Sequence, residues 1–224
     1  MLKSLVIAFL SFLPIFFWIN FVLSKDKKKE PPFLLFFAFT LGALSTLPIL
    51  YVEKIFLKNF LPDGMIDYAR FDIYLTITFI LAAIEELFKF LIIRLGIFEF
   101  QAFDEPIDGF IYMAIGALGF AFVENFLFGM KAELLYALPI TTLRGLSSNF
   151  LHFLASGIIG YGFITALLKN SRYLFYIAVL VAICLHTLFN LLIIDVNLSG
   201  LALALLLGVL TILNIEIKIL KELT

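Results

Sequence analysis

The chain has 224 residues, of which 63% are apolar and only 15% are charged. A soluble domain is normally about half apolar, so this excess is too large for one water-facing globule to bury. The formal net charge is −1 and no basic stripe is present, which argues against nucleic acid as a partner. The composition therefore predicts an integral protein of the cell membrane, with the lipid bilayer around it.

Seven stretches are long and apolar enough to cross the hydrocarbon core, which takes about 20 helical residues. They are residues 4–23, 33–53, 72–94, 106–129, 147–168, 173–194 and 198–217. The segment 133–143 is too short to cross and contains Pro139, so an interfacial helix or a tight loop is expected there. We predict an all-α, polytopic transmembrane helix bundle of about seven spans, with eight as the alternative, in a single integral membrane domain over residues 1–224.

The ends of the predicted spans give an orientation and one helix start. No small-x-small cleavage site follows the first stretch, so it is expected to remain as an uncleaved span. Lys25 and the run 27–29 come next, and lysines gather on the cytoplasmic side. We therefore expect the N-terminus outside and the C-terminus in the cytoplasm. Asp104, Glu105 and Pro106 suit the beginning of a helix, which explains them without catalysis.

Ionisable side chains inside a span are costly unless they are paired or hydrated, so each one is a candidate functional residue. Glu85 and Glu86 lie in the third predicted span, one turn before Lys89. Lys89 is expected to neutralise Glu85, the acid four residues before it, which leaves Glu86 as the freer carboxylate. Two adjacent carboxylates in a low dielectric do not both ionise cheaply, which favours one proton donor and one proton acceptor. A polar clasp between helices and an ion-coupled transporter are the alternatives.

The fourth and fifth predicted spans add further polar groups. Glu124 is a second acid or a metal ligand, and Asn125 beside it can hold a carboxylate or a substrate amide. From just before the fifth span into its first half, a polar residue recurs every fourth position, which in a helix makes one inward stripe of Arg144, Ser148, His152 and Ser156. The simpler alternatives are a glutamate that reaches to water and a histidine bonded into the structure.

The sixth span carries His186 and Asn190 one turn apart, so both lie on one helix face. Such a pair can polarise a carbonyl or hold a water, and a structural bond between helices is the alternative. In the predicted topology Glu124, His152 and His186 lie in the outer half of the membrane, with the acid pair nearer the middle. All these groups are therefore expected to share one water-accessible cavity.

Five features in order resemble the PrsW family of intramembrane proteases, which is similar in turn to the CAAX prenyl endopeptidase and bacteriocin-immunity superfamily. They are EELFK at 85–89, DEPIDG at 104–109, FAFVEN at 120–125, His152 and HTLFN at 186–190. The resemblance covers about the middle half of the chain and indicates a catalytic core at about residues 72–194. The prenyl proteases have arginine one position after Lys89 and histidine in place of Glu124. Both departures agree with the PrsW branch and argue against a prenyl substrate.

The resemblance implies hydrolysis of a peptide bond in a membrane-anchored protein, as in the outer-side first cut of an anti-sigma factor. It implies that Glu85 or Glu86 is the general base, and the freer Glu86 is favoured. It also implies that His186 and Asn190 stabilise the oxyanion, and that His152 orients water or binds metal. A zinc site made of Glu85, His152 and His186 is the alternative to a metal-free glutamate enzyme. The chain has no HExxH motif and its two histidines lie on different predicted helices, so the metal-free version is favoured.

A non-enzymatic membrane protein is the alternative function, either a pseudo-protease scaffold or an ion-coupled transporter. A transporter should show an internal repeat with broken helices in matching halves. No repeat is found, and Pro48 and Pro139 do not occupy corresponding positions. A scaffold would not need every acid and histidine of the set to be intact. Both observations favour the enzyme.

Overall fold

The computed structural model describes residues 2–24, 28–61, 70–99 and 106–223. Within these ranges the seven predicted helices are confirmed, together with one short 3-10 turn. The elements are α1 (Leu2–Leu23), α2 (Pro32–Phe60), α3 (Phe71–Gly96), α4 (Pro106–Lys131), α5 (Leu134–Leu168), α6 (Arg172–Ile193), η1 (Val196–Leu198) and α7 (Ser199–Leu223). The fold class is therefore all-α, as the composition indicates.

Five of the described helices are long and apolar enough to cross a membrane: α1, α2, α4, α5 and α6. α3 differs because Glu85, Glu86 and Lys89 fall close together in its second half. The apolar stretch described for α7, Ser199–Ile215, is shorter than the roughly 20 residues that a typical span takes. The number of spans and the orientation of the termini stay predictions.

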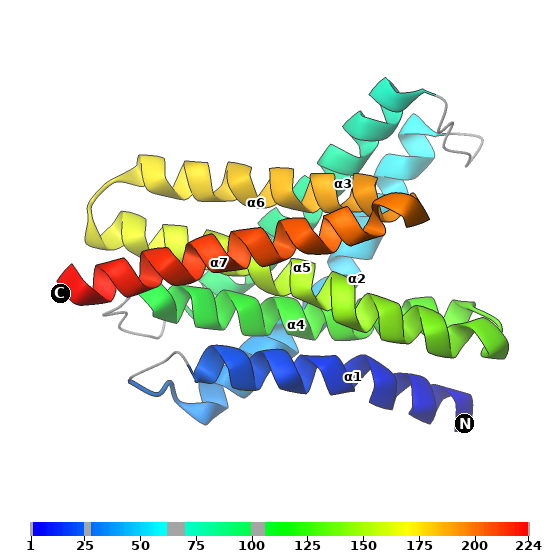
Figure 1. The fold of residues 1–224 in the computed structure, drawn as a ribbon, viewed down its shortest axis with the longest axis horizontal. Helices are drawn as coiled ribbons and strands as arrows, with labels where there is room; N and C mark the ends of the chain where they lie inside the picture. The colour runs from blue at the N-terminus through cyan, green and yellow to red at the C-terminus, as the bar shows by residue number, and fades with distance from the viewer. Residues whose placement is uncertain (1, 25–27, 62–69, 100–105, 224) are drawn as a thin grey trace.

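Successive helices run in opposite directions, and the bundle is built around α4 and α5 (Figure 1). Of the apolar stretch in each of these two helices, 72% is buried, against 22% in α1. Residues 107–121 of α4 form one unbroken buried run. α2 and α3 lie at an angle to the other helices, and their joined ends extend away from the bundle (Figure 1). The polar residues predicted on α4 and α5 therefore lie in the most enclosed part of the fold.

Glycines allow α4 to approach its neighbours closely. A Cβ on Gly42 of α2 would overlap the backbone of Gly116 in α4, and a Cβ on Gly109 would overlap that of Gly160 in α5. Small residues at such crossings let helices pack backbone to backbone, where dispersion contacts replace a hydrophobic driving force. These crossings fix the spacing of the helices that carry the polar groups.

Two expected boundaries are wrong. Residues 134–143 are not a separate interfacial helix or loop but the first turns of α5, with Pro139 inside the helix. Proline removes one helical hydrogen bond, and here the chain on both sides continues the same helix. α2 likewise continues past residue 53 to Phe60. Pro106 begins α4 as expected, whereas Asp104 and Glu105 lie outside the described residues.

Candidate active site

Four helices bring most of the predicted polar residues into one buried cluster. α3 contributes the acid pair and Lys89, α4 contributes Glu124, α5 contributes His152, and α6 contributes His186. The two imidazole rings lie edge to face, with their centres 5.2 Å apart. The predicted convergence of these side chains is confirmed, whereas the water-accessible cavity expected around them stays a prediction. Their depth in a membrane stays a prediction.

Lys89 pairs with the other acid from the one expected. Its Nζ donates to Glu86 Oε1 at 2.6 Å and lies 3.8 Å from Glu85 Oε2. Glu86 also accepts a hydrogen bond from Ser156 at 2.5 Å and contacts His186 Nδ1 at 2.9 Å, and its side chain is fully buried. The prediction that Glu86 is the freer carboxylate is therefore wrong, because groups from α5 and α6 surround it.

Glu85 has the less engaged carboxylate. Its Oε2 is buried and has no hydrogen-bond partner among the residues that the structure describes. Three nitrogens surround that oxygen beyond hydrogen-bonding distance: Lys89 Nζ at 3.8 Å, His152 Nδ1 at 3.9 Å and His186 Nε2 at 3.9 Å. A carboxylate oxygen in this position is available to a reacting group, which the saturated oxygens of Glu86 are not.

Glu124 joins the cluster to its basic partner on α5. Its Oε2 accepts a hydrogen bond from Arg144 Nη2 at 2.7 Å and contacts His152 Nε2 at 3.2 Å. Arg144 Nε also donates to Asn125 Oδ1 at 2.9 Å. The arginine and the histidine lie on one face of α5, and Ser148 between them is buried. The expected polar stripe is confirmed.

Asn190 is not brought into this network. It is half-buried within α6, and its side chain makes no hydrogen bond to any residue in the described part of the chain. The oxyanion role expected for it is an untested prediction.

Three further residues contribute to the cluster without having been singled out as site candidates. Asn149 is fully buried and accepts a hydrogen bond from Asn125 at 2.5 Å. Ser156 belongs to the predicted stripe, and its bond to Glu86 could not be foreseen. Glu53 of α2 is half-buried, and its charge interacts with those of Glu85 and Glu124. The sequence alone could have indicated Glu53 and Asn149 as candidates, because Glu53 lies at the end of one apolar stretch and Asn149 lies within another.

The two histidines adopt opposite tautomers, so that each presents its unprotonated nitrogen to the centre of the cluster. An ionised carboxylate only accepts hydrogen bonds, so contact with Glu86 places the proton of a neutral His186 on Nδ1 and leaves Nε2 unprotonated. Contact with Glu124 likewise places the proton of His152 on Nε2 and leaves Nδ1 unprotonated. Both unprotonated nitrogens lie 3.9 Å from Glu85 Oε2.

These residues fit a zinc ion. Glu85, His152 and His186 each offer one ligand atom, and the three atoms lie within 4.8 Å of one another. Two imidazoles and a carboxylate form a donor set of catalytic zinc sites, with a fourth position open to water. Each histidine also bonds a carboxylate through its other nitrogen, which is how proteins orient zinc-binding histidines. The structure thus supplies the support that a metal site needs.

Lys89 occupies the same space. Its Nζ lies 3.1 Å from His152 Nδ1, the nitrogen that would face a metal. Since an ammonium group and a divalent cation repel each other, binding of zinc requires Lys89 to leave His152 and keep only its pair with Glu86. In the present arrangement the lysine supplies the positive charge at the centre of the cluster.

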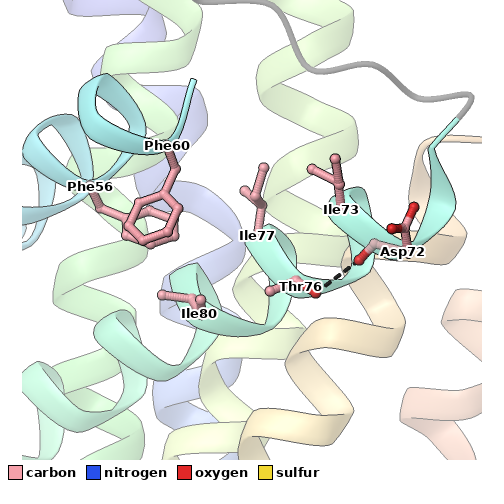
Figure 2. Close-up of a pocket in the computed structure, with 7 residues that line it drawn as sticks. All are labelled: Phe56, Phe60, Asp72, Ile73, Thr76, Ile77 and Ile80. Carbon is pink, nitrogen blue, oxygen red and sulfur yellow. Dashed lines mark hydrogen bonds between the residues drawn. The ribbon is translucent and has the colours of Figure 1, made fainter. Parts of the chain in front are cut away.

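A separate cavity of about 300 Å³ lies between the C-terminal end of α2 and the N-terminal half of α3 (Figure 2). Aromatic and isoleucine side chains line most of it. Asp72 and Thr76 are its polar members, and the Thr76 hydroxyl donates to the Asp72 carbonyl at 2.8 Å. Ile80 of this lining precedes Glu85 by five residues, which is about 7.5 Å along the helix. The cavity contains no predicted site residue and lies at the N-terminal half of α3, whereas the acid pair belongs to the C-terminal half.

Comparison with known proteins bears on this cluster. Residues 30–215 match the protein-family profile described as PrsW family intramembrane metalloprotease, a range that contains every site residue named above. No solved structure matches the chain.

Curated relatives carry the name Protease PrsW. The chain is 32% identical to the one from Oceanobacillus iheyensis over 143 residues, which are 64% of this chain and 61% of that protein. It is 31% identical to the one from Clostridioides difficile over 189 residues, 81% of this chain and 76% of that protein. It is 27% identical to the one from Geobacillus kaustophilus over 177 residues, 76% and 71% of the two lengths. The match to the first of these spans less than two thirds of that relative.

Proposed function

Because the chain belongs to the PrsW family of intramembrane metalloproteases, we propose that it is an intramembrane endopeptidase that hydrolyses a peptide bond in a membrane-anchored protein. The observation that supports this reaction best is the carboxylate of Glu85. One of its oxygens is buried without a hydrogen bond in the described part of the chain and lies among three nitrogens. The alternative of a scaffold gives no reason to keep such an oxygen unsatisfied, because a buried polar atom without a partner is destabilising.

Glu85 is the proposed proton carrier. It accepts the proton of the attacking water as that water adds to the peptide carbonyl, and it returns the proton to the leaving amine. Glu86 takes no part in this exchange, because Lys89, Ser156 and His186 occupy its oxygens. Its proposed role is to hold His186 with the proton on Nδ1. This replaces the assignment of Glu86 as the likelier base.

The tautomers favour zinc over the metal-free version predicted from the sequence. Neutral His186 with its proton on Nδ1 does not donate from Nε2, so it does not serve as the expected oxyanion donor. Held by Glu85, His152 and His186, a zinc ion would polarise the substrate carbonyl and lower the pKa of a bound water. With zinc bound, Glu85 Oε2, which faces the two histidine nitrogens, would hold the metal, and Oε1 would take the proton.

The finer proposal is that the substrate is a single-span anti-sigma factor, cut first near the outer face of the cell membrane. It is supported by the sequence resemblance and by the orientation that the positive-inside rule predicts, under which the cluster lies in the outer half of the bilayer. The antiparallel course of successive helices (Figure 1) agrees with alternating spans. The N-terminus is then outside and the C-terminus cytoplasmic.

The test is cleavage of a single-span substrate by purified protein in liposomes. Glu85→Gln is expected to abolish cleavage, since an amide does not accept the proton, and to leave the fold intact. The matched control is Glu133→Gln, an exposed acid at the start of α5 that makes no capping hydrogen bond. Full cleavage by the Glu85 variant would refute its role. If the wild type cleaved no substrate, with or without added zinc, the pseudo-protease scaffold would replace the enzyme.

Metal dependence has its own readout. We expect one zinc per chain by mass spectrometry of the purified protein, and His186→Ala is expected to lose it. A strong chelator should stop cleavage, and added zinc should restore it. Cleavage that persists without zinc would return the proposal to a metal-free glutamate enzyme.

The orientation is tested separately by cysteine labelling. Cys184 is the single cysteine of the chain, so Cys184→Ser provides a background without thiols. A cysteine in place of Lys131 should react with an impermeant maleimide from outside, and one in place of Lys28 only after lysis. The reverse pattern would overturn the orientation.

A further inference from the structure

Arg144 is held more firmly than a partly exposed arginine usually is. Its Nη2 donates to Glu124 Oε2 at 2.7 Å and its Nε donates to Asn125 Oδ1 at 2.9 Å. The guanidinium carbon lies 3.9 Å from the centre of the Phe128 ring, a cation–π contact. The side chain is only 25% exposed. A planar guanidinium can make all three contacts at once, whereas a lysine ammonium can replace at most one or two.

The carboxylate oxygen that Arg144 holds is also the one that meets His152. Glu124 Oε2 lies 3.2 Å from His152 Nε2. Because Arg144 keeps Glu124 ionised and in place, this oxygen can only accept, and Nε2 must carry the proton. On the other side of the ring Lys89 Nζ lies 3.1 Å from Nδ1. An ammonium group can only donate, so Nδ1 must be the acceptor. The two constraints select the same tautomer.

The surroundings keep the ring from turning over. Phe120 packs edge-on against His152, with ring centres 5.1 Å apart at 73°. Asn125, which orients Arg144, is itself bonded to the fully buried Asn149. The network begins at Asn149, a buried residue of α5, and passes through Asn125 of α4 to Arg144 of α5. From Arg144 it reaches His152 Nε2 through Glu124.

From this geometry we infer that Arg144 is a positioning residue that acts through Glu124 to hold His152 with its proton on Nε2. The consequence for the reaction rests on the proposed function: Nδ1 stays unprotonated 3.9 Å from Glu85 Oε2. It becomes available to a proton or to zinc when Lys89, whose Nζ lies 3.1 Å from it, moves away. When Arg144 is lost, Glu124 is free to turn toward water, and the ring divides between its two tautomers.

The test is nitrogen NMR of protein labelled with ¹⁵N-histidine, and it needs no substrate. The chain has two histidines, so two rings are observed, and His186→Gln assigns them. In the metal-free wild type the His152 signals should show a protonated Nε2 and an unprotonated Nδ1. In Arg144→Met they should show a mixture of both tautomers, while the His186 signals keep their positions. Arg172→Met, at an exposed arginine that begins α6, should reproduce the wild type.

Arg144→Lys provides the second variant, because it keeps a cation beside Glu124 and preserves the fold if the methionine variant does not. It should retain the wild-type tautomer in a larger fraction of molecules than Arg144→Met. In cleavage assays Arg144→Met should lower kcat about 10–100-fold, as loss of a partner that orients a site histidine does, with little change in KM. A folded Arg144→Met protein with an unchanged His152 spectrum would overturn the inference. It would mean that Arg144 only joins α4 to α5. A wild-type spectrum with the proton on Nδ1 would also overturn it. Neither result depends on whether the protein cleaves a peptide.

Discussion

Replacing Lys89 by methionine is predicted to destabilise the fold by about 3–5 kcal/mol, the range for breaking a buried ion pair by removing one partner. The change removes the ammonium group and keeps a side chain of similar length. Glu86, whose side chain is fully buried, is then left with only the neutral donors Ser156 and His186. A buried carboxylate without a cation is the source of the loss.

The distances indicate which of the two acids loses more stabilisation when Lys89 is replaced. At an effective dielectric of about 20, charges 2.6 Å apart attract by about 6 kcal/mol and charges 3.8 Å apart by about 4 kcal/mol. Glu86 is therefore the stronger ion-pair partner of Lys89, and Glu85 is the weaker one. Glu86→Gln alone should destabilise less than Lys89→Met, because Lys89 can still pair with Glu85. The double variant, with neither of the two charges, should recover most of the loss.

Thermal unfolding in detergent provides the assay, with the fluorescence of Trp18 as the signal. It is the single tryptophan of the chain, and it stacks on Phe150 of α5 at 4.4 Å. Its surroundings therefore change when α1 separates from the bundle. A loss of this size lowers the unfolding temperature by on the order of 10 °C for a chain of this length.

The control is Lys54→Met, an exposed lysine inside α2, which should unfold near the wild-type temperature. A loss below about 1 kcal/mol in Lys89→Met, or a double variant no more stable than it, would refute the reasoning. Either result would mean that Glu86 is not held as a buried anion by Lys89.

Three further predictions concern packing and the support of the cluster. Gly42→Ala should destabilise the fold, because its Cβ would overlap the carbonyl of Gly116, whereas Gly208→Ala, with open space around it, should be neutral or stabilise by up to about 1 kcal/mol; thermal unfolding distinguishes them. Lys3→Met removes two hydrogen bonds to the last carbonyls at the end of α4, so hydrogen exchange should rise at the turn into α5, and unchanged exchange would contradict the capping role. Ser156→Ala leaves the second oxygen of Glu86 without its donor and should lower the free energy of unfolding by about 1.5–3 kcal/mol. An unfolding temperature equal to that of the wild type would contradict this.

The sequence was sufficient to predict the helices and the acids and histidines that form the cluster, because an ionisable or amide side chain is conspicuous in an apolar helix. It was not sufficient for the pairing. The helical rule of four residues favours Glu85 as the partner of Lys89, and the structure shows Glu86 instead. The difference comes from Ser156 and His186, which reach Glu86 from other helices. The spacing of residues within one segment gives no information on contacts with side chains from other helices.

The same limit applies at two other positions. The sequence predicts an interfacial helix or a tight loop at residues 133–143, which contain Pro139, yet α5 continues through this proline. Proline removes only one helical hydrogen bond, so its presence alone does not decide where a helix ends. Asn149 was overlooked because it lies one position outside the every-fourth stripe of α5. That offset directs it to Asn125 on α4 rather than to the acids.

The pairing of Glu86 with Lys89 also bears on how the protein enters the membrane. Both residues belong to α3 and lie three positions apart, so this helix brings its own counter-ion and needs no other segment to supply one. Each unpaired charge at the centre of a helix raises the free energy of insertion by about 2.5–3.5 kcal/mol. In the predicted topology α3 crosses the bilayer, so the pairing of Glu86 with Lys89 lowers the free energy that its insertion into lipid requires. His152 and His186 belong to α5 and α6, so they contact the acids only where these helices pack against α3.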